Sequence, residues 1–373
     1  MGVEAGKLDA LLSRASREVD EGVLPSCQVA VGYGGEVVAF EVFGDATLDT
    51  RYHVFSCTKP MVASAVWILL GEEAVDVARP VADYVPAFAA NGKHTVTVEH
   101  LLLHTSGFPH ATLLPPAWDT REGRLAAFAS WELSFEPGTA FEYHPTSAHW
   151  VLAEVVQAAS GVDFWDFFEQ RVTAPAGLPG RVLGVPIDRQ EGVAVLSATG
   201  EPATPDELEA AIGVRELPTN EVTEENLLAF NRPDIRAVGV PGAGGIMRAA
   251  DLALFGQALL HDRPGIWRDD VRADAIGTVR NRFGDPLFGM PANRTLGLVQ
   301  AGDDGLAFLR GFGSATSPRA IGHNGAGGQI SWADPATGIS FGYATNGIDA
   351  NIIRQFRRGM ALSTMAAGLA GEV

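Results

Sequence analysis

The sequence predicts an α/β fold of the α+β kind, with an antiparallel sheet flanked by helices and built from both ends of the chain. Residues 26–45 carry two β-rich runs around Gly34-Gly35, which is typical of a hairpin. Residues 319–347 repeat that pattern, with the runs QISWA and ISFGYAT on either side of the turn at 334–338. Hairpins rather than βαβ units supply these strands, so the sheet should be antiparallel. The long middle of the chain has helical periodicity and is expected to form a mostly helical insertion.

Each end of the chain also carries an expected helix. The N-terminal segment places Leu8, Leu11, Leu12 and Ala15 on one face, and the C-terminal segment turns helical over about 351–370. Five helices are expected in the middle, at residues 60–73, 98–104, 121–131, 146–160 and 249–261. Residues 185–235 are polar and acidic, and they give no clear assignment.

The chain of 373 residues is long enough for two domains. We expect an α/β domain from residues 1–75 and 275–373 and a mostly helical domain from residues 76–274. A functional site would then lie at the seam between the two.

The charge balance argues against nucleic acid and membrane partners. Lys and Arg number 27 against 45 Asp and Glu, and the formal charge of −18 repels phosphate backbones and anionic lipid. The two cysteines, Cys27 and Cys57, fit a reducing compartment. The longest apolar stretch, 61–70, is too short for a membrane span, and the N-terminal segment has no signal-peptide pattern. We therefore expect a cytoplasmic protein, whose oligomeric state the sequence leaves open.

Several familiar motifs are incomplete in this chain. It contains no GxSxG nucleophile elbow, since the match GISFG at 338–342 falls in the run expected to be a strand. The glycine-rich runs at 242–245 and 325–328 complete neither a dinucleotide-binding nor a phosphate-binding loop. His100 and His104 have the spacing of a metal-binding helix, but the intervening residues are leucines. Helix capping or core hydrogen bonding explains them better. No metal and no organic cofactor is predicted.

One motif carries chemistry: Ser56 and Lys59 form S-x-x-K directly before an apolar helix, with Pro60 suited to its first turn. Residues three apart on a helix are neighbours, so the amine can reach the hydroxyl. Serine becomes a nucleophile only when a base takes its proton, and burial lowers the pKa of a lysine enough for that task. Tyr143 in FEYHPTSAHW is a candidate to share the proton. The alternative is an N-cap serine, a surface lysine and a loop tyrosine.

Taken together, residues 20–360 resemble the serine β-lactamase and penicillin-binding-protein superfamily. The resemblance is to its class C-like branch, which includes family VIII carboxylesterases, D-aminopeptidases and acyltransferases. It depends on motifs in the expected order: LPSCQVAVGYGGEV, SCTKP, DVARPVADYVPAF, VEHLLLHTSGF, FEYHPTSAHWVLAEVVQAASG, GVPGAGGIMRAADLALFGQALL and GHNGAGGQISWADP. It implies a β-lactamase/transpeptidase-like fold with the active site at the seam of the two domains.

The resemblance also implies roles for particular residues. Ser56 would be the acylated nucleophile, Lys59 its base and proton relay, and Tyr143 the base that activates the water or alcohol releasing the acyl group. The triplet His323-Asn324-Gly325 stands in the place of Lys-Thr-Gly and would contact substrate. The backbone N–H groups of Ser56 and Ala326 would form the oxyanion hole.

The chain departs from the β-lactamase pattern at two places. Tyr143-His144-Pro145 replaces Tyr-x-Asn, and His323 replaces the lysine of the third element. Both departures weaken the case for efficient β-lactam hydrolysis, because an imidazole holds a carboxylate less firmly than an ammonium. His110 and Trp118, in the Pro-rich loop at 108–118, are further candidates for substrate binding. The alternatives are an exposed loop histidine and a cover over the seam.

The favoured function is a serine hydrolase, a carboxylesterase that acts on a small-molecule ester or acyl substrate through an acyl-enzyme on Ser56. Acyl transfer to an alcohol or amine, D-amino-acid amidase or peptidase activity and weak β-lactamase activity stay open. So does a different class of protein, a catalytically silent member that binds an acyl ligand or a partner protein. Cys57 is expected to be a small buried apolar group, and Asp251 is expected to begin a helix.

Overall fold

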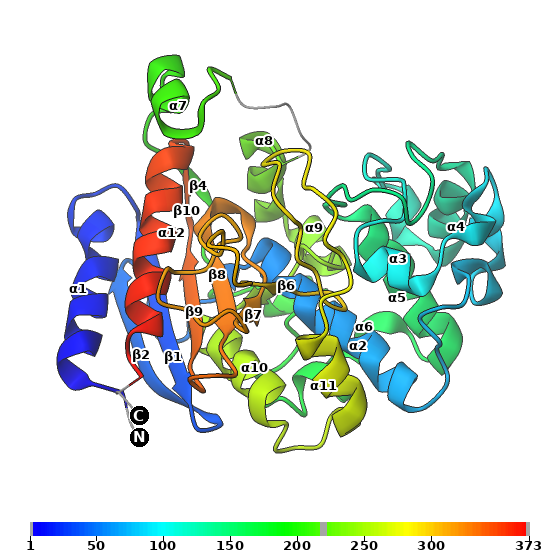
Figure 1. Ribbon diagram of the computed structural model, residues 1–373, viewed down its shortest axis with the longest axis horizontal. Coiled ribbons are helices and arrows are strands. Elements are labelled where there is room, and N and C mark those ends of the chain that lie inside the picture. The colour runs from blue at the N-terminus through cyan, green and yellow to red at the C-terminus, as the bar shows by residue number, and fades with distance from the viewer. Residues whose placement is uncertain (1–2, 217–221, 371–373) are drawn as a thin grey trace.

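A six-stranded antiparallel sheet forms one side of the molecule and a group of helices forms the other (Figure 1). The computed structural model describes residues 3–216 and 222–370. The strands lie in the order β2-β1-β9-β8-β7-β6, so strands from the two ends of the chain are neighbours at β1 and β9. Their bounds are β1 (Ser26–Tyr33), β2 (Glu36–Gly44), β6 (Val299–Gln300), β7 (Ile321–Gly322), β8 (Ile330–Ala333) and β9 (Ser340–Thr345). The predicted fold class and both predicted hairpins are confirmed.

Helices cover both faces of the sheet. Helices α1 (Ala5–Asp20) and α12 (Ile352–Ala367) pack against one face, and α10 (Ala249–His261) packs against the other. Successive side chains of a strand point to opposite faces of the sheet. Val29 and Val31 of β1 accordingly belong to the apolar cluster under α1 and α12, while Ala30 belongs to the cluster under α10. This double cover explains why β1 is buried at every residue from Ser26 to Gly32, including the polar Gln28.

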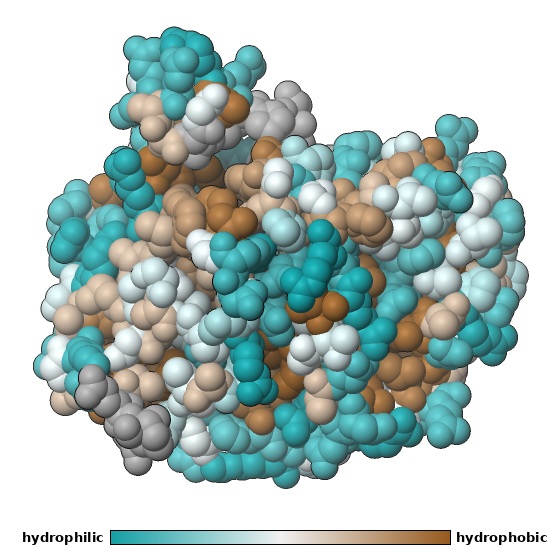
Figure 2. All heavy atoms as spheres, viewed as in Figure 1, coloured by the Kyte–Doolittle hydropathy of each residue, from teal (hydrophilic) through white to brown (hydrophobic). Residues whose placement is uncertain are grey.

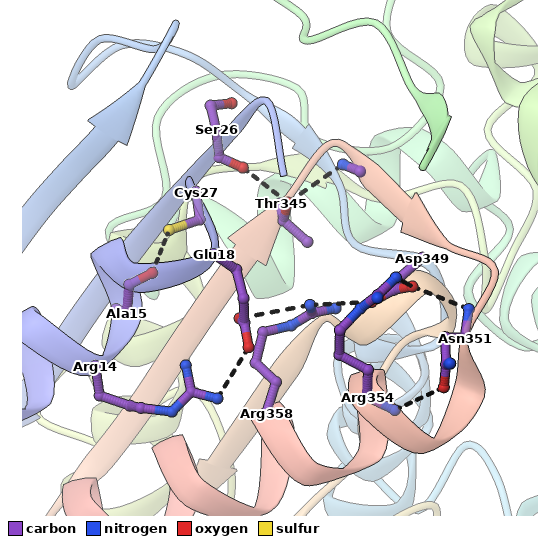
Figure 3. A network of polar contacts seen from close by, with 11 residues as sticks. Arg14, Ala15, Glu18, Ser26, Cys27, Thr345, Asp349, Asn351, Arg354 and Arg358 are labelled. Carbon is purple, nitrogen blue, oxygen red and sulfur yellow. Dashed lines mark hydrogen bonds and ion pairs between the residues drawn. The ribbon is translucent and has the colours of Figure 1, made fainter. Parts of the chain in front are cut away.

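A buried ionic network connects α1 and α12 with the strand β10, on the side of the sheet that these two helices cover (Figure 3). Arg358 of α12, only 1% exposed, lies 3.5 Å from the carboxylate of Glu18 in α1 and 3.4 Å from that of Asp349 in β10 (Gly347–Asp349). Arg14 pairs with Glu18 at 2.9 Å, and Arg354 pairs with Asp349 at 2.6 Å. The network anchors both terminal helices to the strand that follows β9.

The helical part is organised around α2 (Lys59–Gly71), which is buried from its first residue to residue 69. It packs against α5, α6 and α11. The surrounding helices are α3 (Val98–Leu102), α4 (Arg121–Ser130), α5 (Ser147–Ser160), α6 (Phe164–Phe168) and α11 (Asp269–Gly277). The five helices predicted in the middle of the chain are confirmed, with ends within two residues. The domain boundaries stay a prediction, and two helices pack with the domain to which they were not assigned. Helix α2, from the range 1–75, is the centre of the helical core, and α10, from the range 76–274, covers the sheet.

The segment at 185–235, which the sequence left unassigned, forms short elements on one edge of the molecule. Strand β4 (Ser197–Thr199) pairs in parallel with β10. Outside this segment, a second short pair joins β3 (Tyr52–His53) to β5 (Ile246–Met247). The helices here are α7 (Pro205–Ile212), α8 (Glu224–Leu228) and α9 (Pro233–Val238), while residues 217–221 lie outside the described residues. Helix α7 projects from the body, and hydrophilic residues dominate this projection in Figure 2. Within the described ranges no helix combines the length and apolarity that crossing a bilayer requires.

Candidate active site

The Ser56 hydroxyl lies in a tight turn between β3 and α2. Residues Phe55–Thr58 form a 3₁₀ turn that leads into α2, and Pro60 occupies the first turn of that helix as expected. Phe55 has a positive φ of 44°, which is strained for a residue with a side chain. Its buried ring packs edge-to-face on Phe230, with the ring centroids 5.4 Å apart, and this contact helps to hold the turn. The strain is stored next to the reactive hydroxyl.

Lys59 is fully buried and its amine faces three oxygens. Nζ lies 3.0 Å from Ser56 Oγ, 2.7 Å from the carbonyl oxygen of Pro145 and 2.9 Å from that of Gly242. Burial lowers the pKa of this amine, and the nearby Tyr143 opposes that shift. In the neutral form the two carbonyls take the two hydrogens, and the lone pair is left facing Ser56 Oγ. In this arrangement the neutral amine can accept a proton from the serine hydroxyl.

Tyr143 completes a cluster with Ser56 and Lys59. Its Oη lies 2.8 Å from Ser56 Oγ, and the Lys59 amine lies 5.0 Å from the centre of its ring. The ring packs on His104, with the centroids 4.9 Å apart, and His104 Nδ1 accepts a hydrogen bond from the backbone N–H of His144. The structure thus brings together three side chains that lie as much as 87 residues apart in the chain.

The third element passes beside the nucleophile turn as a close backbone contact. A Cβ atom on Gly325 would lie 2.2 Å from the Val54 carbonyl oxygen, so only glycine allows this approach. Ala326 follows and shares an apolar cluster with Phe55. Asn324 turns away, because its amide donates to the carbonyl of Gly311 at 2.8 Å.

His323 is buried and neutral. Its Nδ1–H donates to the carbonyl oxygen of Asn324 at 2.8 Å, and burial lowers its pKa well below the ordinary value, with the positive charges of Arg294 and Lys59 adding to that effect. Nε2 then carries the lone pair, and it has no hydrogen-bond partner among the described residues. The ring lies 5.7 Å from the ring of Tyr143. At this position the site offers a hydrogen-bond acceptor, whereas the β-lactamase pattern that the chain resembles has a positively charged lysine here.

The family model described as Beta-lactamase matches residues 11–355. The chain belongs to the Beta-lactamase family. Within this family it is a serine hydrolase, with relatives that are named as esterases.

Two curated proteins are similar to this chain over more than half of its length. Esterase/beta-lactamase LipL of Mycobacterium tuberculosis (strain ATCC 25618 / H37Rv) is 29% identical over 318 residues, which cover 80% of this chain and 70% of LipL. Esterase EstB of Burkholderia gladioli is 31% identical over 225 residues, which cover 53% of this chain and 56% of EstB.

Solved structures share the fold over nearly the whole chain. A family VIII carboxylesterase superposes with a TM-score of 0.76 at 26% identity and covers 98% of this chain and 99% of its own. A penicillin-binding protein homolog from Caulobacter crescentus superposes with a TM-score of 0.77 at 24% identity, over the same shares of the two chains. At that identity the second match shows the fold alone.

The other two predicted substrate-binding residues lie elsewhere. His110 is exposed, and its Nε2 lies 3.0 Å from the carboxylate of Glu142, the neighbour of Tyr143. Trp118 packs against the helical core, where its ring stacks on Trp150 with the centroids 6.4 Å apart. A substrate-binding role for either residue stays a prediction.

Several structural interpretations of single residues are confirmed. Cys57 is buried in the helical core, and burial raises the pKa of its thiol. Asp251 accepts the backbone N–H of Arg248 at the start of α10, and His100 caps α3 together with Thr97. His104 makes the core hydrogen bond to His144.

The sequence reasoning missed two features of the site. One is the pair of carbonyls that hold Lys59, because backbone groups have no sequence signature. The other is Arg294, whose guanidinium carbon lies 5.5 Å from the centre of the Tyr143 ring. An arginine inside the small and apolar stretch PANRTLGLV was the available signal.

Proposed function

We propose that this member of the Beta-lactamase family is a carboxylesterase that acts on small-molecule esters through an acyl-enzyme on Ser56. The observation that supports this proposal best is the position of Ser56 Oγ, which lies 3.0 Å from the buried Lys59 amine and 2.8 Å from Tyr143 Oη. The names of the relatives LipL, EstB and the family VIII carboxylesterase point the same way.

In the first half of the reaction, Ser56 Oγ attacks the ester carbonyl while its proton passes to the Lys59 and Tyr143 pair. The negative charge that develops on the carbonyl oxygen would be held by the backbone N–H groups of Ser56 and Ala326. The alcohol leaves with a proton from the same pair. The Gly325 contact with Val54 supports this assignment, because it brings the segment of Ala326 beside the nucleophile turn.

In the second half, a water molecule replaces the alcohol. Tyr143 Oη lies next to Ser56 Oγ and would take the proton of that water as it attacks the acyl carbon. The Ser56 oxygen then leaves as the hydroxyl. A bound alcohol in place of water would turn the same steps into acyl transfer.

The neutral state of His323 favours esters over β-lactams. A β-lactam antibiotic carries a carboxylate, and the imidazole presents only an acceptor nitrogen at this position. A neutral ester demands no cation there. His323 Nε2 can instead accept a hydrogen bond from a substrate N–H or O–H group.

The test is a substrate panel combined with covalent labelling. Purified protein is assayed with p-nitrophenyl acetate, butyrate and octanoate, with D-alanine p-nitroanilide and with a chromogenic cephalosporin, and intact mass is recorded after exposure to a fluorophosphonate. We expect ester turnover at least 100-fold faster than amide or cephalosporin turnover and a single adduct on Ser56.

A matched pair of variants separates chemistry from folding. Ser56→Ala should abolish turnover and labelling, while Ser64→Ala, on the same buried helix, should retain both. An adduct on another residue, or faster turnover of the amide or the cephalosporin, contradicts the proposal.

A further inference from the structure

Arg294 is a buried arginine without an acidic partner. It is 7% exposed, and it forms no ion pair within residues 3–216 and 222–370. Its Nε and Nη1 atoms are buried and have no hydrogen-bond partner there. Buried donors are nearly always paired, because an unpaired one loses its hydrogen bonds to water without replacement, at a cost that is larger when the group is charged. The position of this charge therefore needs an explanation.

The guanidinium lies on the aromatic wall of the catalytic cluster. Its central carbon is 5.5 Å from the ring centre of Tyr143 and 5.5 Å from that of Phe141. Backbone hydrogen bonds with Arg280 and Asn281 hold residue 294 in place. The charge is thus fixed beside the phenol that contacts Ser56.

The other titratable groups around Tyr143 and Lys59 do not supply a competing charge. Those that face the pair are Cys57, His104, His149 and His323. Burial raises the pKa of Cys57 and lowers the pKa of all three histidines well below the ordinary value, so these groups are neutral near pH 7. Asp285 acts on Arg294 only at longer range, without an ion pair.

We propose that Arg294 is a positioning residue for the proton relay: its fixed charge keeps the Lys59 amine unprotonated and stabilises negative charge on Tyr143 Oη. A guanidinium suits this task, because it stays charged even when buried. His323, which stands where the resemblance has lysine, is neutral, so the permanent charge near the relay comes from Arg294, in the segment before β6. This inference rests on the proposed role of Ser56 as a nucleophile.

The sign of the expected effect follows from Coulomb's law. A positive charge near an amine disfavours its protonation, and the same charge favours a phenolate. Loss of the charge lets the Lys59 amine hold its proton to higher pH. Ser56 activation then needs a higher pH.

The experiment measures the rate of Ser56 phosphonylation by an uncharged fluorophosphonate between pH 5 and 10, read by intact mass. Arg294→Met should shift the midpoint of the acid limb to higher pH by about one unit, so that the rate at pH values below that midpoint falls about 10-fold. Arg294→Lys retains the charge and should keep the limb within about 0.3 units. Arg310→Met is the matched control, since Arg310 is equally buried but pairs with Asp304. It should lower stability and leave the limb in place.

Each outcome bears on one hypothesis. A limb that does not move in Arg294→Met, with the variant folded by circular dichroism, overturns the inference. A rate that changes only for an anionic fluorophosphonate also overturns it, because Arg294 would then bind substrate. No Ser56 adduct in the unmodified protein at any pH overturns the proposed function itself.

Discussion

Two buried arginines in this molecule differ in their partners. Arg358, behind the sheet, is 1% exposed and lies between the carboxylates of Glu18 and Asp349 (Figure 3). Arg294, beside the cluster of Ser56, Lys59 and Tyr143, is 7% exposed and has the rings of Phe141 and Tyr143 in place of carboxylates. The first charge is neutralised by its surroundings, whereas the second projects its field onto neighbouring groups.

The comparison shows how one residue type can have two uses. A paired buried charge holds elements together, and its energetic value appears when one partner is removed. An unpaired buried charge costs stability and is found where it shifts the proton affinity of reactive groups. The two regions should therefore respond differently to substitution.

The largest expected effect is on activity at the seam. Lys59→Met removes the amine that faces Ser56 Oγ and should lower ester hydrolysis by about 10³-fold, within the range for loss of a general base. Its thermal midpoint should change little, because the variant also loses the cost of burying an amine. Activity assays and differential scanning calorimetry on the same sample test this. A midpoint that falls by more than 10 °C would contradict it.

The next effect is on stability behind the sheet. Arg358→Met leaves Glu18 and Asp349 without their shared partner and should lower the free energy of unfolding by about 3–5 kcal/mol. Urea unfolding measures this. Arg354→Met is the control, since its half-exposed side chain contacts the same Asp349 and its loss should cost less. Labelling of Ser56 in folded Arg358→Met should stay within tenfold of the parent. A loss of about 10³-fold, as expected for Lys59→Met, would contradict the separation of the two regions.

The smallest effect concerns a buried group that is unpaired but neutral. Burial lowers the pKa of His53 to about 3, and both of its ring nitrogens lack a hydrogen-bond partner among the described residues. The unfolded chain binds a proton here below pH 6.5 and the folded chain does not, so stability is present above that pH and is lost as the pH falls toward 3. His53→Leu should reduce the loss of unfolding free energy between pH 7 and 5.5 by about 1 kcal/mol.

Urea unfolding at the two pH values tests this last prediction. His94→Leu serves as the control for loss of an exposed histidine. An unchanged pH dependence in His53→Leu would show that other groups carry the acid sensitivity.

Local features of the molecule were predictable because their causes lie within a few residues. The hairpin at Gly34-Gly35 follows from turn chemistry, and both glycines have positive φ. The contact of Ser56 with Lys59 follows from the spacing of three on a helix. Tyr143 was a candidate for its chemistry, and only the resemblance assigned it to the same site as Ser56, since nothing local connects the two residues.

The unpredicted features depend on long-range packing or on weak local signals. Arg294 contacts Tyr143 only in the folded chain, and nothing local in the sequence indicates that contact. Trp118 packs in the helical core, where it stacks on Trp150. Helix α7 was missed although Thr204, Pro205 and Glu207 form a capping box with proline at the first position. That signature was readable, but the polar composition around it hid the helix.

The adjacency of β1 and β9 has a consequence for how the molecule is made. The first hairpin leaves the ribosome with one edge open, and its partner strand arrives only about 300 residues later in synthesis. Gly325 and Ala326 are also made late, after the residues whose carbonyls face the Lys59 amine. A nascent chain that stops short of Gly325 lacks the second proposed oxyanion donor, so it should be unreactive toward acylating agents until residues 325 and 326 have been made.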